Sequence, residues 1–326
     1  MATQRQQSPT VLVTGTTPTS FLTALEGLGY EVFSESPRSL LDTDLFSRRI
    51  ANAHFYICGG LESASDNILA TARVLRAIIF LGVDAGAYFD KPAALKRGID
   101  VYETPGANAR ATADQTLMLM LGALRGFPIL SQALHKKTWS DYRGRDLATQ
   151  KILLVGMGHI AKRVASILHH GFGCEVAYHS RTRQLLVEDL LDLSWTENLH
   201  DGLRRADIVS LHLPLVWPSP GKHFLDDDEL NKMRRGSILV NTSSPHLVNP
   251  QSLYRSLADR RITMASFDGF YKEGPDAFQI EESKLFDFAP ERFFMTPHTA
   301  WHSKESEQRV FHQALEIMRA LRSGHR

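Results

Sequence analysis

The sequence has little cysteine and no long hydrophobic run. Its two cysteines, Cys58 and Cys174, lie in apolar surroundings and form neither a CxxC pattern nor a nucleophile motif. This excludes a disulfide scaffold and favours buried, reduced thiols. The longest apolar stretch, Leu117 to Leu124, is too short to cross a bilayer, and the polar N-terminus lacks the apolar core of a signal peptide. We therefore expect a soluble, cytoplasmic protein with no membrane partner.

An excess of charge is also missing. The chain has 37 basic and 36 acidic residues and a formal charge of +1, so there is no general attraction to nucleic acid or to an anionic bilayer. Only a local basic patch could supply one. The 326 residues suit two domains, and 43% hydrophobic residues suffice for full cores. Internal repeats and low-complexity tracts are absent from the sequence.

What the sequence does have is a β-α-β rhythm, and it occurs twice. Short β-branched runs alternate with amphipathic runs over residues 8–105, and a second series of strand-like runs begins at Lys151. The run "NARATADQTLMLMLGALRGF" between them predicts a long connecting helix, whose Leu and Met stripe suits a core or a subunit interface. This pattern predicts two doubly wound α/β domains with parallel sheets.

The second series opens with a candidate phosphate-binding turn. The strand "KILLVG" leads into Gly156, Met157, Gly158, His159 and Ile160, and a helical pattern follows. Gly156 permits the tight turn, and Gly158 lets the backbone approach a pyrophosphate, which the free N–H groups of the helix start would stabilise. Because a strand and a helix flank the motif, we predict dinucleotide binding here.

The next strand indicates which dinucleotide is preferred. NAD-binding units place an acidic residue about twenty positions after the turn. Here Ser180, Arg181, Thr182 and Arg183 follow the strand instead. Cations and hydroxyls attract a ribose 2′-phosphate, so we predict a preference for NADP(H), with NAD(H) possible. A basic loop that only faces solvent is the alternative.

Several segments together resemble the D-isomer-specific 2-hydroxyacid dehydrogenase family. They are "PGANARATADQTLMLMLGALR", "ADIVSLHLPL", "GSILVNTSS", "MASFDGFYKEGP" and "FFMTPHTAWHS", and the similarity runs over nearly the whole chain. The run "TPHTAW" is most similar to the subgroup that includes the C-terminal-binding-protein corepressors. In that subgroup a tryptophan, here Trp301, follows three residues after the histidine.

The resemblance implies a fold, an assembly and a site. The cofactor domain, residues 108–296, would be inserted into a discontinuous flavodoxin-like catalytic domain, residues 1–107 plus 297–326. A homodimer would form through the cofactor domains and the crossing helix, and a small-molecule substrate would bind in the cleft. His298 matches the catalytic acid and base, Glu273 matches the carboxylate that orients it, and Asp268 falls among the cofactor-binding residues.

The sequence departs from the family where the substrate carboxylate is bound. The family's arginine clamp is replaced by Ser244 in "NTSSPHL", which cannot supply a cationic fork. His246 either replaces the missing donor or faces solvent. In the substrate loop "LGVDAGAYFD", Asp84 and Tyr88 make the region near Val83 less favourable for a carboxylate. We assign Val83, Asp84, His246 and Trp301 to the substrate site.

These features leave more than one function open. The leading hypothesis is an NADP(H)-preferring oxidoreductase that transfers hydride to or from a carbonyl or hydroxyl substrate other than a simple 2-oxo acid. The alternative is a catalytically inactive dinucleotide-binding sensor or assembly protein, and a third reading retains ordinary 2-oxo acid reduction with another cation in the cleft. His298 and His302 lack a third ligand, so we expect no metal site.

Overall fold

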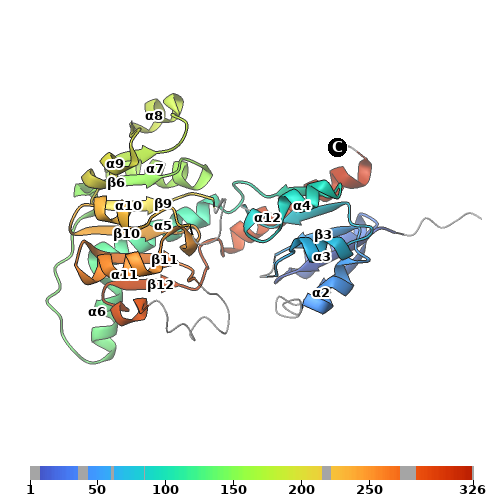
Figure 1. Cartoon of the computed structure of the whole chain (residues 1–326), viewed down its shortest axis with the longest axis horizontal. Coiled ribbons are helices and arrows are strands. Elements are labelled where there is room, and N and C mark those ends of the chain that lie inside the picture. Colours follow the sequence, from blue (N-terminus) through green and yellow to red (C-terminus); the bar gives the residue numbers. More distant parts are fainter. Residues whose placement is uncertain are drawn as a thin grey trace, which may run out of the picture. The chain divides into compact units, whose positions relative to one another are not determined.

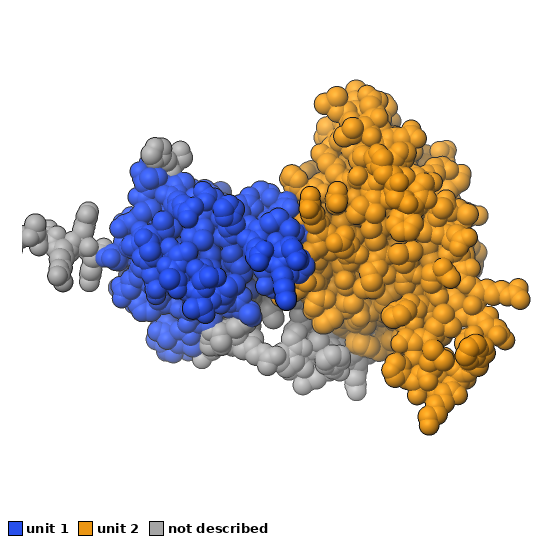
Figure 2. Space-filling model, turned by 180° about the vertical axis from the view of Figure 1, so that it is seen from behind, with its two compact units in different colours: residues 1–108, 303–326 blue, residues 109–302 orange. Residues whose placement is uncertain are grey.

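A computed structural model describes residues 8–35, 43–59, 62–83, 85–214, 222–271 and 284–324 (Figure 1). Glu273 and Asp84, two of the predicted site residues, lie outside these described residues. The chain divides into two compact units, which Figure 2 colours separately. Unit 1 comprises residues 1–108 and 303–326, and unit 2 comprises residues 109–302.

Unit 1 contains a five-stranded parallel sheet with the order β2-β1-β3-β4-β5. Its strands are β1 (Thr10–Thr14), β2 (Glu31–Glu35), β3 (Phe55–Cys58), β4 (Ala77–Phe80) and β5 (Asp100–Glu103). Its α-helices are α1 (Thr19–Gly27), α2 (Thr43–Ile50), α3 (Asp66–Thr71), α4 (Lys91–Lys96) and α12 (Lys304–Ser323), and a 3-10 helix spans Ala85–Ala87. Every strand pair is parallel, as the predicted β-α-β rhythm requires.

Helices cover both faces of the unit 1 sheet. Residues of α2, α3 and α4 pack on one face, and residues of α1 and α12 pack on the other. The C-terminal helix α12 contributes Val310, Phe311, Ala314 and Met318, all buried, to the second core. The chain therefore returns to unit 1 after unit 2, and β1 and α12 belong to the same unit.

Unit 2 contains a seven-stranded parallel sheet with the order β12-β11-β10-β9-β6-β7-β8. Its strands are β6 (Lys151–Val155), β7 (Glu175–His179), β8 (Ser194–Trp195), β9 (Ile208–Leu211), β10 (Ser237–Asn241), β11 (Ile262–Asp268) and β12 (Phe293–Thr296). Its α-helices are α5 (Ala109–Arg125), α6 (Phe127–His135), α7 (His159–Phe172), α8 (Leu185–Leu191), α9 (Leu199–Arg205), α10 (Asp227–Lys232) and α11 (Pro250–Ala258). Three 3-10 helices span Leu147–Thr149, Pro245–Leu247 and Leu285–Phe288.

The long helix α5 lies on one face of this sheet beside α7, whereas α9, α10 and α11 cover the other face (Figure 1). The predicted stripe on α5 is core, because Leu117, Met120 and Leu124 are buried. The two parallel sheets with helices on both faces confirm the predicted fold class. Of the helices that the structure describes, none alone is long and apolar enough to cross a membrane, and α5 and α6 would qualify only as a pair bent by 67°.

Candidate functional site

The glycine turn after β6 has the geometry that phosphate binding requires. Gly156 has φ +100°, and a side chain there would overlap the carbonyl oxygen of His212 at the end of β9. Gly158 begins α7, and a Cβ on it would meet no atom within 4 Å. The first bond of α7 runs from the Lys162 N–H to the Gly158 carbonyl at 3.0 Å, so the N–H groups before it have no acceptor within the helix. The turn therefore fits a dinucleotide pyrophosphate, with the N–H groups of Gly158, His159 and Ile160 as donors.

His212, next to this turn, was not singled out by the sequence. The Nδ1 atom of its ring is buried and has no hydrogen-bond partner in the described part of the chain, whereas the Nε2 atom lies 3.0 Å from the Ser210 hydroxyl. Burial lowers the pKa of the imidazole to about 3. The ring is therefore neutral at physiological pH, and its backbone carbonyl closes the space beside Gly156.

We expect His212 to make unit 2 sensitive to acid. The unfolded chain takes up a proton near the ordinary pKa of 6.5, whereas the folded chain does so only near 3, so the unfolded state binds more protons between these values. The free energy of unfolding should therefore fall by about 1.4 kcal/mol per pH unit as the pH drops below 6. All four tryptophans belong to unit 2, so tryptophan fluorescence during urea unfolding at pH 7 and pH 5 reports this unit.

The matched comparison is His212→Asn, whose amide can still bond to Ser210. This variant should lose less stability between the two pH values than the wild type, whereas His135→Asn, at an exposed position, should behave as the wild type does. Equal pH dependence in all three proteins would contradict a titration of His212.

The loop between β7 and α8 carries the predicted adenosine-binding residues. Arg183 forms a two-pronged pair with Glu188, with its Nη2 2.8 Å from Oε2 and its Nε 3.1 Å from Oε1. This hydrogen bond lowers the pKa of Glu188. The Tyr178 hydroxyl donates to the same carboxylate at 2.7 Å, and the Gln184 side chain donates to the Met157 carbonyl at 3.1 Å. The loop is thus held rigidly against the glycine turn.

Because of this network, the two arginines of the loop differ in their partners. The charge of Arg183 is already balanced by Glu188, whereas Arg181 is exposed, and none of the described carboxylates lies within 4.0 Å of it. The Ser180 hydroxyl donates to the Thr182 carbonyl at 2.7 Å, so Ser180, Arg181 and Thr182 stay together at the carboxyl end of β7. Of the two cations, Arg181 is the one available to a ligand.

The segment after β10 explains the polar residues of "NTSSPHL". The buried Asn241 side chain donates to the Ser244 carbonyl at 3.0 Å and accepts from the Ser243 N–H at 2.9 Å. The Ser243 hydroxyl donates to the Leu211 carbonyl at 3.1 Å. The Ser244 hydroxyl accepts from the His246 N–H at 3.3 Å and begins the 3-10 helix of residues 245–247. These contacts shape the loop, and Ser243 and Ser244 bring no cationic side chain to it.

His246 lies one turn further, and its side chain is exposed. Its ring meets the ring of Tyr271 edge to face, with centroids 5.8 Å apart. Burial raises the pKa of the Tyr271 phenol, whose hydroxyl has no hydrogen-bond partner among the described residues. The Asn249 side chain caps the following helix α11, and Pro250 is the first residue of that helix. His246 thus stands between two ordered elements at the carboxyl edge of the sheet.

The turn that carries His298 is fixed by Asp268. This carboxylate at the end of β11 is 2% exposed and accepts from the Thr296 hydroxyl at 2.5 Å, the Thr299 N–H at 2.9 Å and the Ala300 N–H at 2.8 Å. His298 itself has φ +53°, a conformation that non-glycine residues rarely adopt, and its N–H donates to the Thr296 carbonyl at 2.9 Å. The predicted cofactor residue Asp268 thus holds the turn with both carboxylate oxygens.

Helix α5 supports the same edge of the sheet from one side. The Gln115 side chain donates to the Thr296 hydroxyl at 3.0 Å, which in turn donates to Asp268. The next residue of α5 makes a second contact, because the hydroxyls of Thr116 and Thr242 lie 2.9 Å apart. Neither Gln115 nor Thr116 stood out in the sequence, because both contacts join residues more than 100 positions apart. Spacing along the chain gives no sign of them.

The remaining predicted residues are separated between the units. Val83 belongs to unit 1, where it is 36% exposed. The Ala85 N–H beside it donates to the Glu103 carboxylate at 2.9 Å, and Lys91 pairs with the same oxygen at 2.6 Å. Trp301 belongs to unit 2 and stacks on His302 with ring centroids 3.8 Å apart. Unit 2 therefore gathers His298, Asp268, Ser244, His246 and Trp301, together with the glycine turn.

Known proteins are similar to this chain in sequence and in fold. Residues 117–300 match the family model described as "D-isomer specific 2-hydroxyacid dehydrogenase, NAD binding domain". A glyoxylate reductase of Aeropyrum pernix is 32% identical over 72% of this chain and 70% of its own length. Among solved structures, the TT0316 protein of Thermus thermophilus superposes with a TM-score of 0.81 at 29% identity, over 97% of both chains.

A more distant structure shares the fold alone. An acyclic imino acid reductase, solved in complex with NADPH and D-Arg, superposes with a TM-score of 0.82 at 19% identity, over 97% of this chain and 98% of the other. The family model covers more than half of the chain and includes both the glycine turn and the His298 turn. The chain therefore belongs to the NAD-dependent D-isomer-specific 2-hydroxyacid dehydrogenase family of oxidoreductases.

Proposed function

We propose that the protein is an NADP(H)-preferring member of this family that acts on a carbonyl or hydroxyl substrate other than a simple 2-oxo acid. The observation that carries the proposal is Ser244. It stands where the family has its carboxylate-binding arginine, and its hydroxyl already accepts the His246 N–H. Losing a charge-assisted pair in a desolvated site costs on the order of 2 to 5 kcal/mol, so a 2-oxo acid would bind weakly.

The substrate loop of unit 1 supports the same conclusion. A substrate carboxylate needs free N–H groups or cations, but the Ala85 N–H is engaged by the Glu103 carboxylate. Lys91, the cation beside it, is paired with that carboxylate as well. A neutral carbonyl compound needs neither of these groups, whereas a carboxylate would find the Ala85 N–H and the Lys91 ammonium already engaged by Glu103.

In this proposal His298 acts as the acid and base. The bound dinucleotide supplies or accepts the hydride at the substrate carbon. During reduction the imidazolium of His298 gives its proton to the carbonyl oxygen as that oxygen gains the electron pair of the broken C=O π bond, and the product is an alcohol. In the reverse direction the neutral imidazole takes the hydroxyl proton. Asp268 and Thr296 hold the turn in place for both directions.

The test is oxidation of NADPH by the pure protein with two substrate sets, one of 2-oxo acids and one of ketones and aldehydes without a carboxylate. We expect turnover with the second set that depends on His298. Turnover confined to glyoxylate-like or hydroxypyruvate-like acids would overturn the proposed substrate class and favour ordinary 2-oxo acid reduction. The glyoxylate reductase activity named for the relative from Aeropyrum pernix makes this comparison necessary.

Arg181 should determine the cofactor preference. Because it is the unpaired cation of the β7–α8 loop, we expect Arg181→Ala to raise the KM for NADPH about tenfold and to leave the KM for NADH nearly unchanged. Arg204→Ala, which removes an exposed arginine paired with Asp201, is the matched control and should change neither constant. An equal change in the KM values for NADPH and NADH would show that Arg181 does not bind the 2′-phosphate.

A second candidate function follows from the same serine. A chain without the arginine clamp could retain cofactor binding and lose turnover, as a sensor or assembly protein similar to the C-terminal-binding-protein subgroup. The tryptophan at position 301 favours this subgroup. In that case NADPH would bind tightly, no substrate would turn over, and cofactor binding would change the dimer population in sedimentation experiments.

We also propose that the protein forms a homodimer through α5 and α6. Phe127 and Leu134 are each 64% exposed and Met118 is 40% exposed, and these helices border an apolar hollow of about 400 Å³. We expect Phe127→Glu to shift the protein from dimer to monomer in sedimentation velocity. Leu95→Glu, at an equally exposed leucine of unit 1, should leave the dimer intact. A wild-type monomer would contradict the proposal.

A further inference from the structure

A basic hollow lies at the opposite edge of the unit 2 sheet from the glycine turn. It opens at the amino ends of β10, β11 and β12 and has a volume of about 430 Å³. The glycine turn, Ser244 and His298 all follow the carboxyl ends of strands. The length of the strands therefore separates the hollow from the dinucleotide and from the proposed chemistry.

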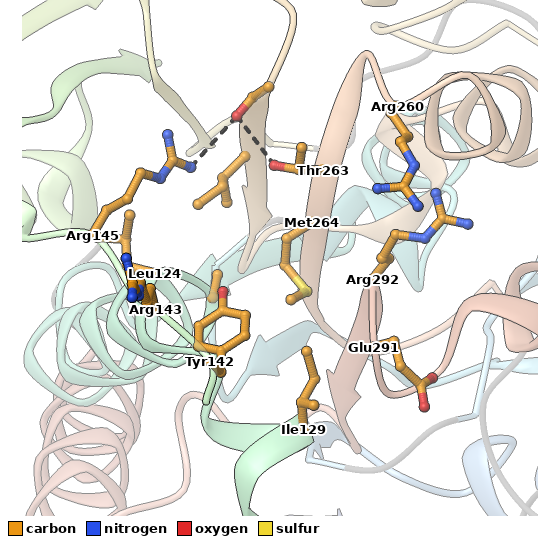
Figure 3. A pocket seen from close by; sticks show the side chains of 13 residues that line it. Leu124, Ile129, Tyr142, Arg143, Arg145, Arg260, Thr263, Met264, Glu291 and Arg292 are labelled. Atoms are coloured by element: carbon orange, nitrogen blue, oxygen red, sulfur yellow. Dashed lines mark hydrogen bonds between the residues drawn. The ribbon is translucent and has the colours of Figure 1, made fainter. Parts of the chain in front are cut away.

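Four arginines line this hollow. Figure 3 shows Arg143 and Arg145 on one side of Met264 and Arg260 and Arg292 on the other. Glu291 is the one carboxylate among the lining residues. The formal charge of the whole chain is only +1, so these arginines concentrate positive charge in one place. They form a local basic patch of the kind that could attract an anion.

These four guanidinium groups have no partner of opposite charge. Within the described ranges no carboxylate lies within 4.0 Å of any of them, whereas eight other arginines each form an ion pair. The contrast is local, because Arg234 and Arg235 just before β10 are paired with Asp207 and Asp259. Repulsion between uncompensated charges favours the binding of an anion among them.

Two of the arginines are held in place by the fold. The Arg292 Nη1 donates to the Leu257 carbonyl at 2.5 Å, and its guanidinium lies 4.3 Å from the centre of the Phe288 ring. The Arg145 Nη2 lies 3.5 Å from the Gly236 carbonyl. Arg143, Arg145 and Arg260 are exposed, whereas Arg292 is half-buried. Several guanidinium donors around one hollow suit an anion with several oxygens.

The rest of the hollow is apolar. Ile238 and Met264 come from the sheet, Leu124 and Ile129 from α5 and α6, and the ring of Tyr142 lies between them in Figure 3. A volume of this size matches small-molecule sites, which combine an apolar lining with a few charged groups. A bare inorganic anion would use the arginines but leave the apolar part unfilled.

We propose that this hollow binds a small polyanion with a flat apolar group, the chemistry of a nucleoside polyphosphate. The phosphates would lie among Arg143, Arg145, Arg260 and Arg292, and the base would lie against Tyr142 and Met264. The four arginines of this site take no part in the proposed dinucleotide binding or proton transfer, although Leu124 and Ile129 belong to the helices of the proposed dimer interface. It therefore stands or falls independently of cofactor preference and substrate class.

The experiment is calorimetric titration of the full chain with ATP, in the presence of saturating NADPH so that the dinucleotide site is filled. We expect one ATP per chain, and about tenfold weaker binding of pyrophosphate, which lacks the apolar group. The double variant Arg143→Gln, Arg260→Gln should weaken ATP binding by tenfold or more. Arg204→Gln, which removes an exposed arginine elsewhere in unit 2, should leave it unchanged.

Four outcomes would overturn the proposal. They are no saturable binding of ATP, equal weakening in the double variant and in Arg204→Gln, competition between ATP and NADPH, and loss of ATP binding at concentrations where the chain is dimeric. The last outcome would assign the hollow to the subunit interface. Far-UV circular dichroism of the double variant provides the check on folding, and both substituted side chains are exposed, so the fold should survive.

Discussion

His298→Ala should lower kcat with any active substrate by roughly 10²- to 10⁴-fold, the usual contribution of a positioned acid or base. The variant removes the proton donor while the glycine turn and the β7–α8 loop stay intact, so the Kd for NADPH should stay near the wild-type value. Because His298 sits at φ +53°, the alanine keeps the backbone conformation under the same strain. The measurement is steady-state turnover together with NADPH fluorescence titration.

The control for this experiment is His312→Ala, which removes an exposed histidine from α12. It should leave kcat and the Kd for NADPH unchanged. Full turnover of every active substrate by His298→Ala would end the proposed acid and base role. Wild-type protein that binds NADPH but turns nothing over would move the conclusion to the sensor function.

Asp268→Ala should have the second largest effect, on both stability and rate. The carboxylate is buried and accepts three hydrogen bonds from the His298 turn, and its removal leaves two backbone N–H groups and one hydroxyl without an acceptor. At about 1 to 3 kcal/mol for each of the three unsatisfied groups, the free energy of unfolding should fall by on the order of 3 to 9 kcal/mol. Displacement of His298 should also lower kcat by ~10²-fold.

The conservative variant Asp268→Asn separates positioning from cofactor binding. Its carbonyl can accept two of the three bonds, but its amide group faces the Ala300 N–H, so stability and kcat should fall between the wild type and Asp268→Ala. If Asp268 acts only by holding the turn, the Kd for NADPH should hardly change in either variant. A large rise in that Kd, with kcat preserved, would instead support the cofactor-binding role predicted from the sequence.

The sequence was sufficient for the features that depend on local pattern. The strand before Gly156 and the helix after Gly158 form where the apolar periodicity placed them, and Asn249 and Pro250 begin α11 as capping residues do. Patterns that repeat within one helical turn or one strand can be recognised in the sequence without knowledge of the fold.

Residue roles that arise from contacts between distant parts of the chain could not be predicted from the sequence. Glu188 pairs with Arg183, which leaves Arg181, the arginine predicted to bind the cofactor, as the available cation of the loop. Asp268 was predicted as a cofactor residue, but both of its oxygens bind the His298 turn, and that engagement depends on the parallel pairing of β11 with β12. The role of Glu273 stays a prediction, since it lies outside the described residues.

The bond between Gln115 and Thr296 has a mechanical consequence. The chain passes between the two units twice, at residues 108–109 and 302–303, and α5 begins at the first passage while the His298 turn precedes the second. Gln115 ties these two segments together through Thr296 and Asp268. The two connecting segments are therefore bonded to each other within unit 2, and any displacement of α5 would be transmitted to the His298 turn.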